Sequence, residues 1–86
     1  MFSIKRAQKE AERNYWAKNG ANIKELEIEI DKAIGNAIKD GERTITYYIP
    51  EKYSYNIIMD VEKLYRKEGY GVLIEYINYY VITIGW

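Results

Sequence analysis

The chain of 86 residues contains no cysteine and no histidine, and it has only one proline. The lack of cysteine excludes a disulfide framework, and the lack of histidine as well excludes an ordinary zinc site. A chain of this length forms one small domain, which buries roughly 60–65% of the surface that its unfolded form exposes. We therefore expect its stability to come from packed Ile, Leu, Val and Tyr, or from self-association. The missing cysteine also fits a reducing compartment.

The residue types that usually carry catalysis are scarce. The only two serines, Ser3 and Ser54, each stand where a helix begins, so both are explained as helix caps. Carboxylates at helical spacing, such as Glu25 with Glu29, are better explained by a solvated helix face than by acid–base chemistry. No loop offers several oxygens beside a glycine to hold a hard cation, and no glycine-rich loop precedes a helix to bind phosphate. The sequence therefore predicts no enzyme, no catalytic residue, no metal site and no cofactor.

The charges balance, because 13 basic and 13 acidic side chains give a net charge of zero. This balance argues against a broad electrostatic attraction to nucleic acid or to an anionic membrane. The distribution is uneven, since residues 1–22 carry a net charge of +3 and residues 23–42 a net charge of −3. We expect the basic segment to pair with the acidic one within the molecule, although it could also orient neighbours in an oligomer.

Membrane insertion and secretion are not expected. No apolar run approaches the ~20 residues that a membrane helix needs. The N-terminus is charged from Lys5 onward and has no apolar centre, so it does not have the pattern of a signal peptide.

Two helices are predicted in the first half of the chain. Residues 3–19 form the first, with Ser3 as its cap and Asn19-Gly20 as its end. Its apolar stripe is thin, so we expect it to be the least stable element, docked by Tyr15 and Trp16 alone. Residues 23–40 form the second helix, which starts at a capping pair and ends at Gly41. Its buried stripe is predicted to contain Ile23, Leu26, Ile30, Ile34, Ala37 and Ile38.

The second half of the chain predicts a strand, a helix and a hairpin. Residues 44–49 alternate as a strand that Pro50 ends. Residues 54–68 form a helix between Ser54 and Gly69, with an expected buried stripe of Ile57, Ile58, Val61, Leu64 and Tyr65. The residues from Gly71 onward read as a two-stranded hairpin, in which Asn78 is placed to adopt positive φ in a slightly longer turn.

The predicted fold class is α+β, with the order ααβαββ and a small three-stranded sheet whose helices pack on one face. Residues 1–86 form a single domain, in which residues 1–20 are an N-terminal helix that is loosely docked and residues 22–86 a compact core. The other face of the sheet is solvated, covered by the first helix or covered by a partner.

Tyrosine is the most informative residue type, with ten in the chain. Adjacent tyrosines in a strand point to opposite faces, so if Tyr47 and Tyr80 face the core, Tyr48 and Tyr79 face outward. Three interpretations remain open for this pair: cross-strand packing that only stabilises the sheet, a protein interface, or base stacking. Base stacking is the least favoured, because the strands carry almost no Arg or Lys among the aromatics.

One part of the sequence resembles a known group of proteins. A helix is followed by Gly69-Tyr70-Gly71-Val72, and the chain closes on an apolar strand ending in Gly85-Trp86. This pattern, over roughly residues 28–86, resembles one that recurs among small proteins of tailed bacteriophages, in which a serine commonly stands where this chain has Gly85. The resemblance implies phage origin and a setting in the cytoplasm of the host bacterium. It supplies no activity and no site residue.

These observations lead to a functional expectation. We expect a small, phage-encoded protein-binding module that modulates a host factor or associates with its own copies. The alternatives are a virion or assembly component and, more weakly, a nucleic-acid-binding accessory protein. The candidate contact residues are Trp16, Tyr48 and Tyr79, with Ile28 as a candidate for self-association into a homo-oligomer.

Overall fold

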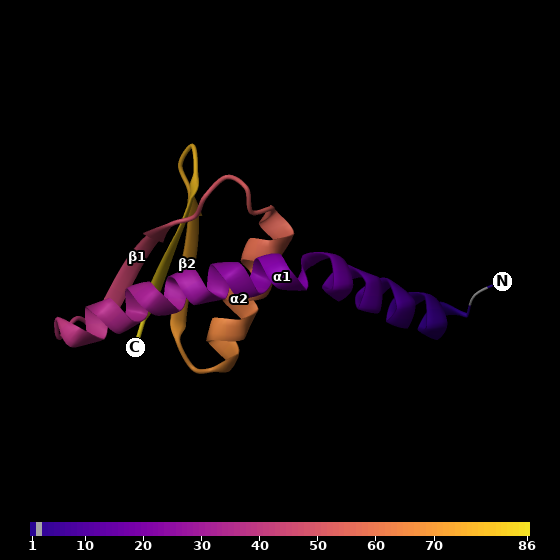
Figure 1. Ribbon diagram of the computed structural model, residues 1–86, viewed down its shortest axis with the longest axis horizontal. Helices are drawn as coiled ribbons and strands as arrows, with labels where there is room; N and C mark the ends of the chain where they lie inside the picture. The colour runs from indigo at the N-terminus through magenta and orange to yellow at the C-terminus, as the bar shows by residue number, and fades with distance from the viewer. Residues whose placement is uncertain (2) are drawn as a thin grey trace.

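The computed structural model describes residue 1 and residues 3–86 and contains two helices and three strands (Figure 1). In chain order these are α1 (Ile4–Lys39), β1 (Thr44–Tyr48), α2 (Tyr55–Lys67), β2 (Gly71–Tyr76) and β3 (Tyr80–Gly85). The predicted α+β class and its three-stranded sheet are confirmed. The sequence of helical and extended segments also agrees, with one difference at the start of the chain that concerns α1.

Residues 4–39 form one continuous helix, so the predicted end at Asn19-Gly20 is wrong. A glycine ends a helix by adopting positive φ, as Gly41 and Gly69 do here, whereas Gly20 keeps a helical backbone. Asn19 also supports the helix, because its side-chain amide donates to the carbonyl oxygen of Tyr15 at 3.1 Å. A glycine inside a helix costs only about 1 kcal/mol relative to alanine, which tertiary contacts on both sides easily offset.

The three strands form one sheet in the order β1-β3-β2, and each neighbouring pair is antiparallel. The central strand β3 aligns Ile84 with Ile45 of β1 and with Val72 of β2. Residues that are aligned in this way point to the same face of the sheet, so the three side chains form one buried row. That row belongs to the face covered by the helices.

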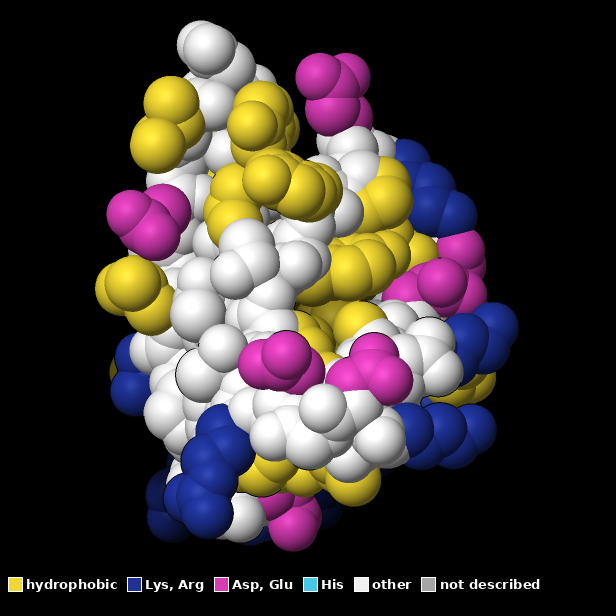
Figure 2. Space-filling view, turned by 90° about the vertical axis from the view of Figure 1, so that its left-hand side faces the viewer, with side chains coloured by type: hydrophobic (Ala, Val, Ile, Leu, Met, Phe, Trp, Pro, Cys, Tyr) yellow, Lys and Arg dark blue, Asp and Glu magenta, His cyan; other side chains and the backbone are white. Residues whose placement is uncertain are grey.

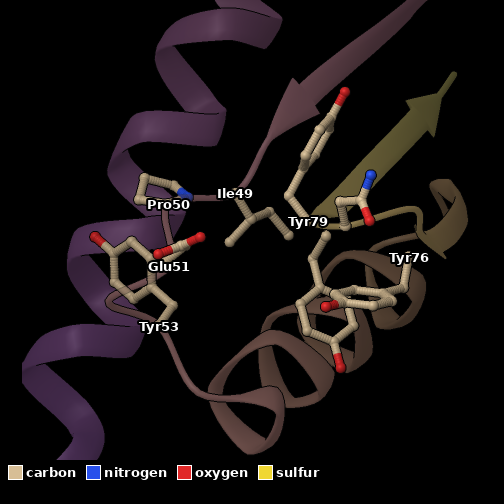
Figure 3. Close-up of a pocket in the computed structure, with 8 residues that line it drawn as sticks. Ile49, Pro50, Glu51, Tyr53, Tyr76 and Tyr79 are labelled. Carbon is tan, nitrogen blue, oxygen red and sulfur yellow. The ribbon is translucent and has the colours of Figure 1, made fainter.

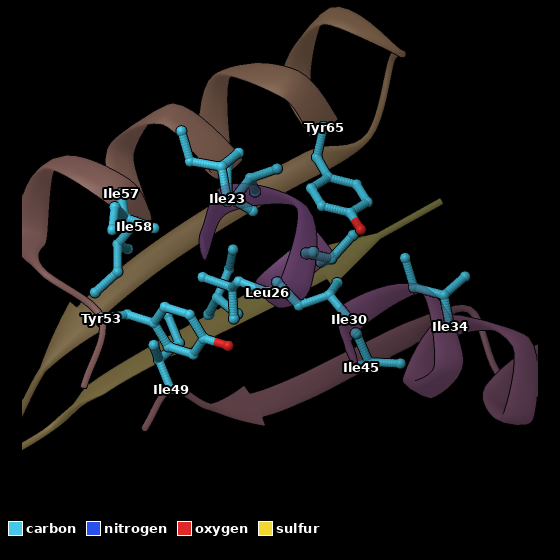
Figure 4. Packing of buried hydrophobic residues seen from close by; sticks show 14 residues of the cluster. Ile23, Leu26, Ile30, Ile34, Ile45, Ile49, Tyr53, Ile57, Ile58 and Tyr65 are labelled. Atoms are coloured by element: carbon cyan, nitrogen blue, oxygen red, sulfur yellow. The ribbon is translucent and has the colours of Figure 1, made fainter. Parts of the chain in front are cut away.

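Both helices pack on this one face of the sheet, as predicted, and enclose the core (Figure 4). Helix α1 supplies Ile23, Leu26, Ile30 and Ile34, and α2 supplies Ile57, Ile58, Val61 and Tyr65. The predicted stripes were wrong at two positions, since Ile38 is 56% exposed and Leu64 is 36% exposed. Both side chains lie at the margin of their helix's buried face, where spacing alone does not determine burial.

Helix α1 extends well past the body of the molecule at its N-terminal end (Figure 1). Its buried residues begin only at Ile23, and nearly all described residues before Tyr15 are exposed. We call residues 3–14 the N-terminal arm. Because the arm continues the axis of α1, it leads away from the acidic residues 23–42 and cannot fold back onto them. The expected pairing of the basic and acidic segments within one molecule is therefore wrong.

Helix and strand ends follow the predicted local chemistry. The Ser3 hydroxyl accepts a hydrogen bond from the Arg6 backbone N–H, and Ser54 does the same for Ile57. At the hairpin turn Asn78 adopts φ of 68°, as predicted. Among the residues that the structure describes, no helix is both long enough and apolar enough to cross a membrane.

Candidate protein-binding surface

The face of the sheet opposite the helices is not covered by any helix or strand that the structure describes. Strand alternation places on it Tyr48 of β1, Leu73 and Glu75 of β2, and Val81 of β3, together with three threonines. The register aligns Val81 with both Tyr48 and Glu75, so these three side chains form one row across the sheet. We call this surface the open face. Tyr48 is 64% exposed and Leu73 is 55% exposed.

A pair of tyrosines marks the end of the open face at the hairpin turn. The rings of Tyr48 and Tyr79 pack edge to face, with 5.4 Å between their centroids, and Tyr79 is 45% exposed. The predicted outward orientation of both residues is what the structure has. Their contact also fits the interpretation as cross-strand packing, since an edge-to-face pair stabilises the sheet locally.

Hydrophobic side chains gather around the hairpin end of the sheet. Ile77 and Tyr76 are both well exposed there, beside Tyr48 and Tyr79. Figure 2 looks at the side of the molecule where β1 and the C-terminal end of α1 lie, and it shows hydrophobic side chains gathered in its upper part. Basic side chains lie along the lower and right-hand margins of the same view.

A small pocket adjoins the tyrosine pair, between the β1–α2 connection and the hairpin turn (Figure 3). Its volume is about 210 Å³. The lining residues are Ile49, Pro50, Glu51, Tyr53, Tyr76, Asn78, Tyr79 and Tyr80. The rings of Tyr76 and Tyr80 pack against each other with centroids 4.8 Å apart, which makes one wall aromatic. We call this cavity the tyrosine pocket.

The other two predicted contact residues lie elsewhere. Trp16 and Ile28 are both on α1 and are each 44% exposed. Twelve residues of helix separate them by about 18 Å along the axis and about 120° around it, so they do not form one patch. Since α1 covers the opposite face of the sheet, neither residue joins Tyr48 and Tyr79. The structure therefore brings together two of the four candidates.

Two further tyrosines hold the helices to each other. Tyr65 of α2 is buried, and its hydroxyl donates to Asp31 Oδ1 of α1 at 2.5 Å. Tyr15 of α1 donates in the same way to Asp60 of α2. Burial and the hydrogen bond to Asp31 raise the pKa of Tyr65, and the hydrogen bond to Asp60 raises the pKa of Tyr15 to about 12. These hydrogen bonds dock α1 on α2, as expected for Tyr15.

Sequence reasoning missed several residues of this surface. Leu73 lies between two residues assigned to the core side, so strand alternation already placed it on the open face. Ile77 stands in a turn, where a β-branched apolar side chain has no core to enter and is left exposed. No sequence pattern indicated Glu51, because this residue lines the tyrosine pocket only through the way the β1–α2 connection folds around Ile49.

Within the described part of the chain, no cluster of three or more Asp, Glu, His or Cys side chains is arranged to hold a metal ion. Comparisons of the chain with protein-family models, with curated proteins and with solved structures found no match.

Proposed function

We propose that this chain is a non-catalytic protein-binding module, phage-encoded as its sequence pattern implies, that acts on a host protein or on its own copies. The surface proposed for contact is the hairpin end of the open face, with Tyr48 and Tyr79 at its centre and Leu73 and Ile77 beside them. The observation that carries the proposal is the exposed tyrosine pair on a sheet face that none of the described helices and strands covers.

The composition of this surface supports a protein as the partner. Tyrosine is enriched at the energetic centres of protein interfaces, since it contributes a large apolar ring and a polar hydroxyl at low entropic cost. On the open face between the strand ends, Glu75 is the only charged side chain. Depletion of charge at the centre of a contact surface is typical of protein interfaces.

The same composition does not favour a nucleic acid. A surface that stacks bases combines aromatic rings with cations that neutralise phosphates. None of the three strands contains a lysine or an arginine. The basic residues of the N-terminal arm lie on α1, which packs on the other face of the sheet.

The test replaces Tyr48 and Tyr79 with glutamate, singly and together, because a charge at the centre of an interface must lose its hydration on binding. Self-association is measured by sedimentation of the wild type from 10 µM to 1 mM. If the wild type is monomeric, host proteins retained from a bacterial lysate are purified and their affinity is measured directly. We expect each substitution to weaken binding by at least about tenfold.

Ile38→Glu is the matched control, since Ile38 is exposed to a similar degree, 56%, but lies near the C-terminal end of α1, on the helical side of the sheet. It should leave binding unchanged. Circular dichroism and urea unfolding establish that all variants are folded. Folded Tyr48 and Tyr79 variants that bind as tightly as the wild type would rule out this surface.

A further inference from the structure

We propose that the tyrosine pocket binds the side chain of an arginine presented by the protein partner. This inference rests on the proposed function, because it names the chemistry that the partner brings to the same end of the molecule. Tyr79 belongs to both features, since its ring contacts Tyr48 on the open face and the residue is also among those that line the pocket. A partner seated at the hairpin end of the open face is therefore next to the pocket.

The size of the pocket fits one side chain. Cavities that hold small-molecule ligands usually measure about 300–1,000 Å³, and the tyrosine pocket measures about 210 Å³. Figure 3 shows two opposed walls, with Pro50 and Tyr53 on one side and Tyr76 and Tyr79 on the other, and Ile49 between them. The space is a slot between rings and apolar side chains, which suits a long, narrow group.

The lining points to a cation. Four of the eight lining residues are tyrosines, and the faces of aromatic rings carry negative potential that attracts cations within about 6 Å. Glu51 stands on the wall between Pro50 and Tyr53, and its carboxylate points toward Ile49 in the slot (Figure 3). A negative charge beside electron-rich rings is complementary to a positively charged side chain and repels a carboxylate.

The charge of Glu51 is available for a partner. The neighbouring base, Lys52, forms its ion pair with Glu25 of α1, and that contact raises the pKa of Lys52 and lowers that of Glu25. Lys52 Nζ also lies 5.1 Å from the centroid of the Tyr53 ring, so this ring already attracts one cation of the chain. No ion pair involves Glu51 within the part of the chain that the structure describes.

Arginine fits this arrangement better than lysine. Its guanidinium is planar and weakly hydrated, so it stacks on aromatic rings and at the same time donates two parallel hydrogen bonds to a carboxylate. A lysine ammonium is compact and strongly hydrated, and it would lose more hydration on entering a slot lined by Ile49, Pro50 and tyrosine rings.

The experiment titrates the ¹⁵N-labelled protein with N-acetyl-arginine methylamide and follows its amide resonances. We expect saturable shifts at Glu51, Tyr53, Tyr79 and Tyr80 with a dissociation constant on the order of 1 mM. The citrulline methylamide keeps the size and shape of the side chain but lacks its charge, and the norleucine methylamide keeps only an apolar chain. Both should bind at least about fivefold more weakly. Equal binding of the citrulline compound would overturn the proposal, as would binding of tetramethylammonium in the absence of arginine binding.

Glu51→Gln should weaken binding of the arginine compound by about three- to tenfold. Glu42→Gln is its control, because it removes the same charge from the opposite end of β1 and should change nothing. Unchanged affinity in Glu51→Gln, or no shifts in the wild type, would refute the arginine site.

Failure of the arginine site and failure of the proposed function give different experimental results. Loss of partner binding in Tyr48→Glu without any response to arginine refutes the arginine site and leaves the protein-binding role in place. Arginine binding together with full partner binding by Tyr48→Glu refutes the open-face surface instead.

Discussion

The hydroxyl groups of Tyr15 and Tyr65 connect helices α1 and α2 by hydrogen bonds. Each donates a hydrogen bond to a carboxylate of the other helix, Tyr15 to Asp60 and Tyr65 to Asp31. A phenol in that position must keep its proton, because a phenolate beside a carboxylate would add a second negative charge. The hydrogen bond to Asp60 is the main cause of the raised pKa of Tyr15, whereas at Tyr65 burial raises the pKa most and the hydrogen bond to Asp31 adds to it.

This arrangement predicts a loss of stability at alkaline pH. In the unfolded chain tyrosine loses its proton near pH 10, whereas in the folded protein Tyr15 holds its proton up to about pH 12. Between these values the unfolded state binds fewer protons than the folded state, so the free energy of unfolding falls as the pH rises. Below pH 10 the contribution is fully present. Urea unfolding at pH 8, 10 and 11 measures the trend.

Tyr15→Phe isolates the contribution of one residue. It should be less stable than the wild type at pH 8, and its further loss of stability toward pH 11 should be smaller. Tyr65, Tyr47 and Tyr53 also have a raised pKa, so part of the alkaline loss persists in this variant. If the wild type and Tyr15→Phe lost stability in parallel from pH 8 to pH 11, the hydrogen bond to Asp60 would not be the cause.

At the scale of the element, the length of helix α1 depends on the conformation of two glycines, Gly20 inside it and Gly41 just after it. Gly20 lies inside the helix, and a Cβ added there would meet only Trp16 Cε3, at an ordinary contact distance of 3.9 Å. Gly41 ends the helix region with φ of 76°, a conformation that strains any residue with a Cβ. The same residue type therefore has opposite roles within one segment of chain.

Alanine substitutions should separate the two roles. Gly20→Ala is expected to raise the free energy of unfolding by about 0.5–1 kcal/mol, because alanine loses less backbone entropy in a helix. Gly41→Ala should lower it by about 1 kcal/mol or more, because its left-handed conformation becomes strained. Both values come from urea unfolding followed at 222 nm. A destabilising Gly20→Ala would indicate a break in α1 at that position.

Some elements could be predicted from the sequence pattern better than others. The periodicity of Ile23, Leu26, Ile30 and Ile34 and the alternation in residues 44–49 were sufficient for helix and strand, since each pattern leaves one apolar face to bury. The continuity of α1 was not predictable in the same way, because Asn19-Gly20 is compatible with both an end and an interior. The sequence likewise placed Tyr48 and Tyr79 outward, but not Glu51, whose position depends on how the β1–α2 connection packs.

For the molecule as a whole, the main feature is a domain of 56 × 28 × 19 Å with much of its length in one helix. The arm of residues 3–14 adds to this length, but it contributes no residue to the core. Inside the arm the helix is supported by the Ser3 cap and by the pair between Arg6 and Glu10, at 3.2 Å. These local contacts are individually weak and exposed.

Removal of residues 1–12 should therefore leave the core folded. We expect the midpoint of urea unfolding to stay nearly unchanged while the helical signal at 222 nm decreases, since exposed helix is lost without lost burial. Removal of residues 1–22 is the contrasting variant, because it also removes the hydrogen bond of Tyr15 to Asp60 and should lower the midpoint. A large drop in midpoint for the shorter truncation would mean that the arm takes part in the cooperative unit.

The position of β3 has a consequence for how the protein is made. Strands β1 and β2 do not pair with each other, and each pairs with β3, which follows both of them in the chain. Until residues 80–85 have been made and have left the ribosome, both earlier strands therefore lack their partner. A chain truncated before Tyr80 would leave β1 and β2 unpaired, and its Ile45 and Val72 would be open to chaperones and proteases.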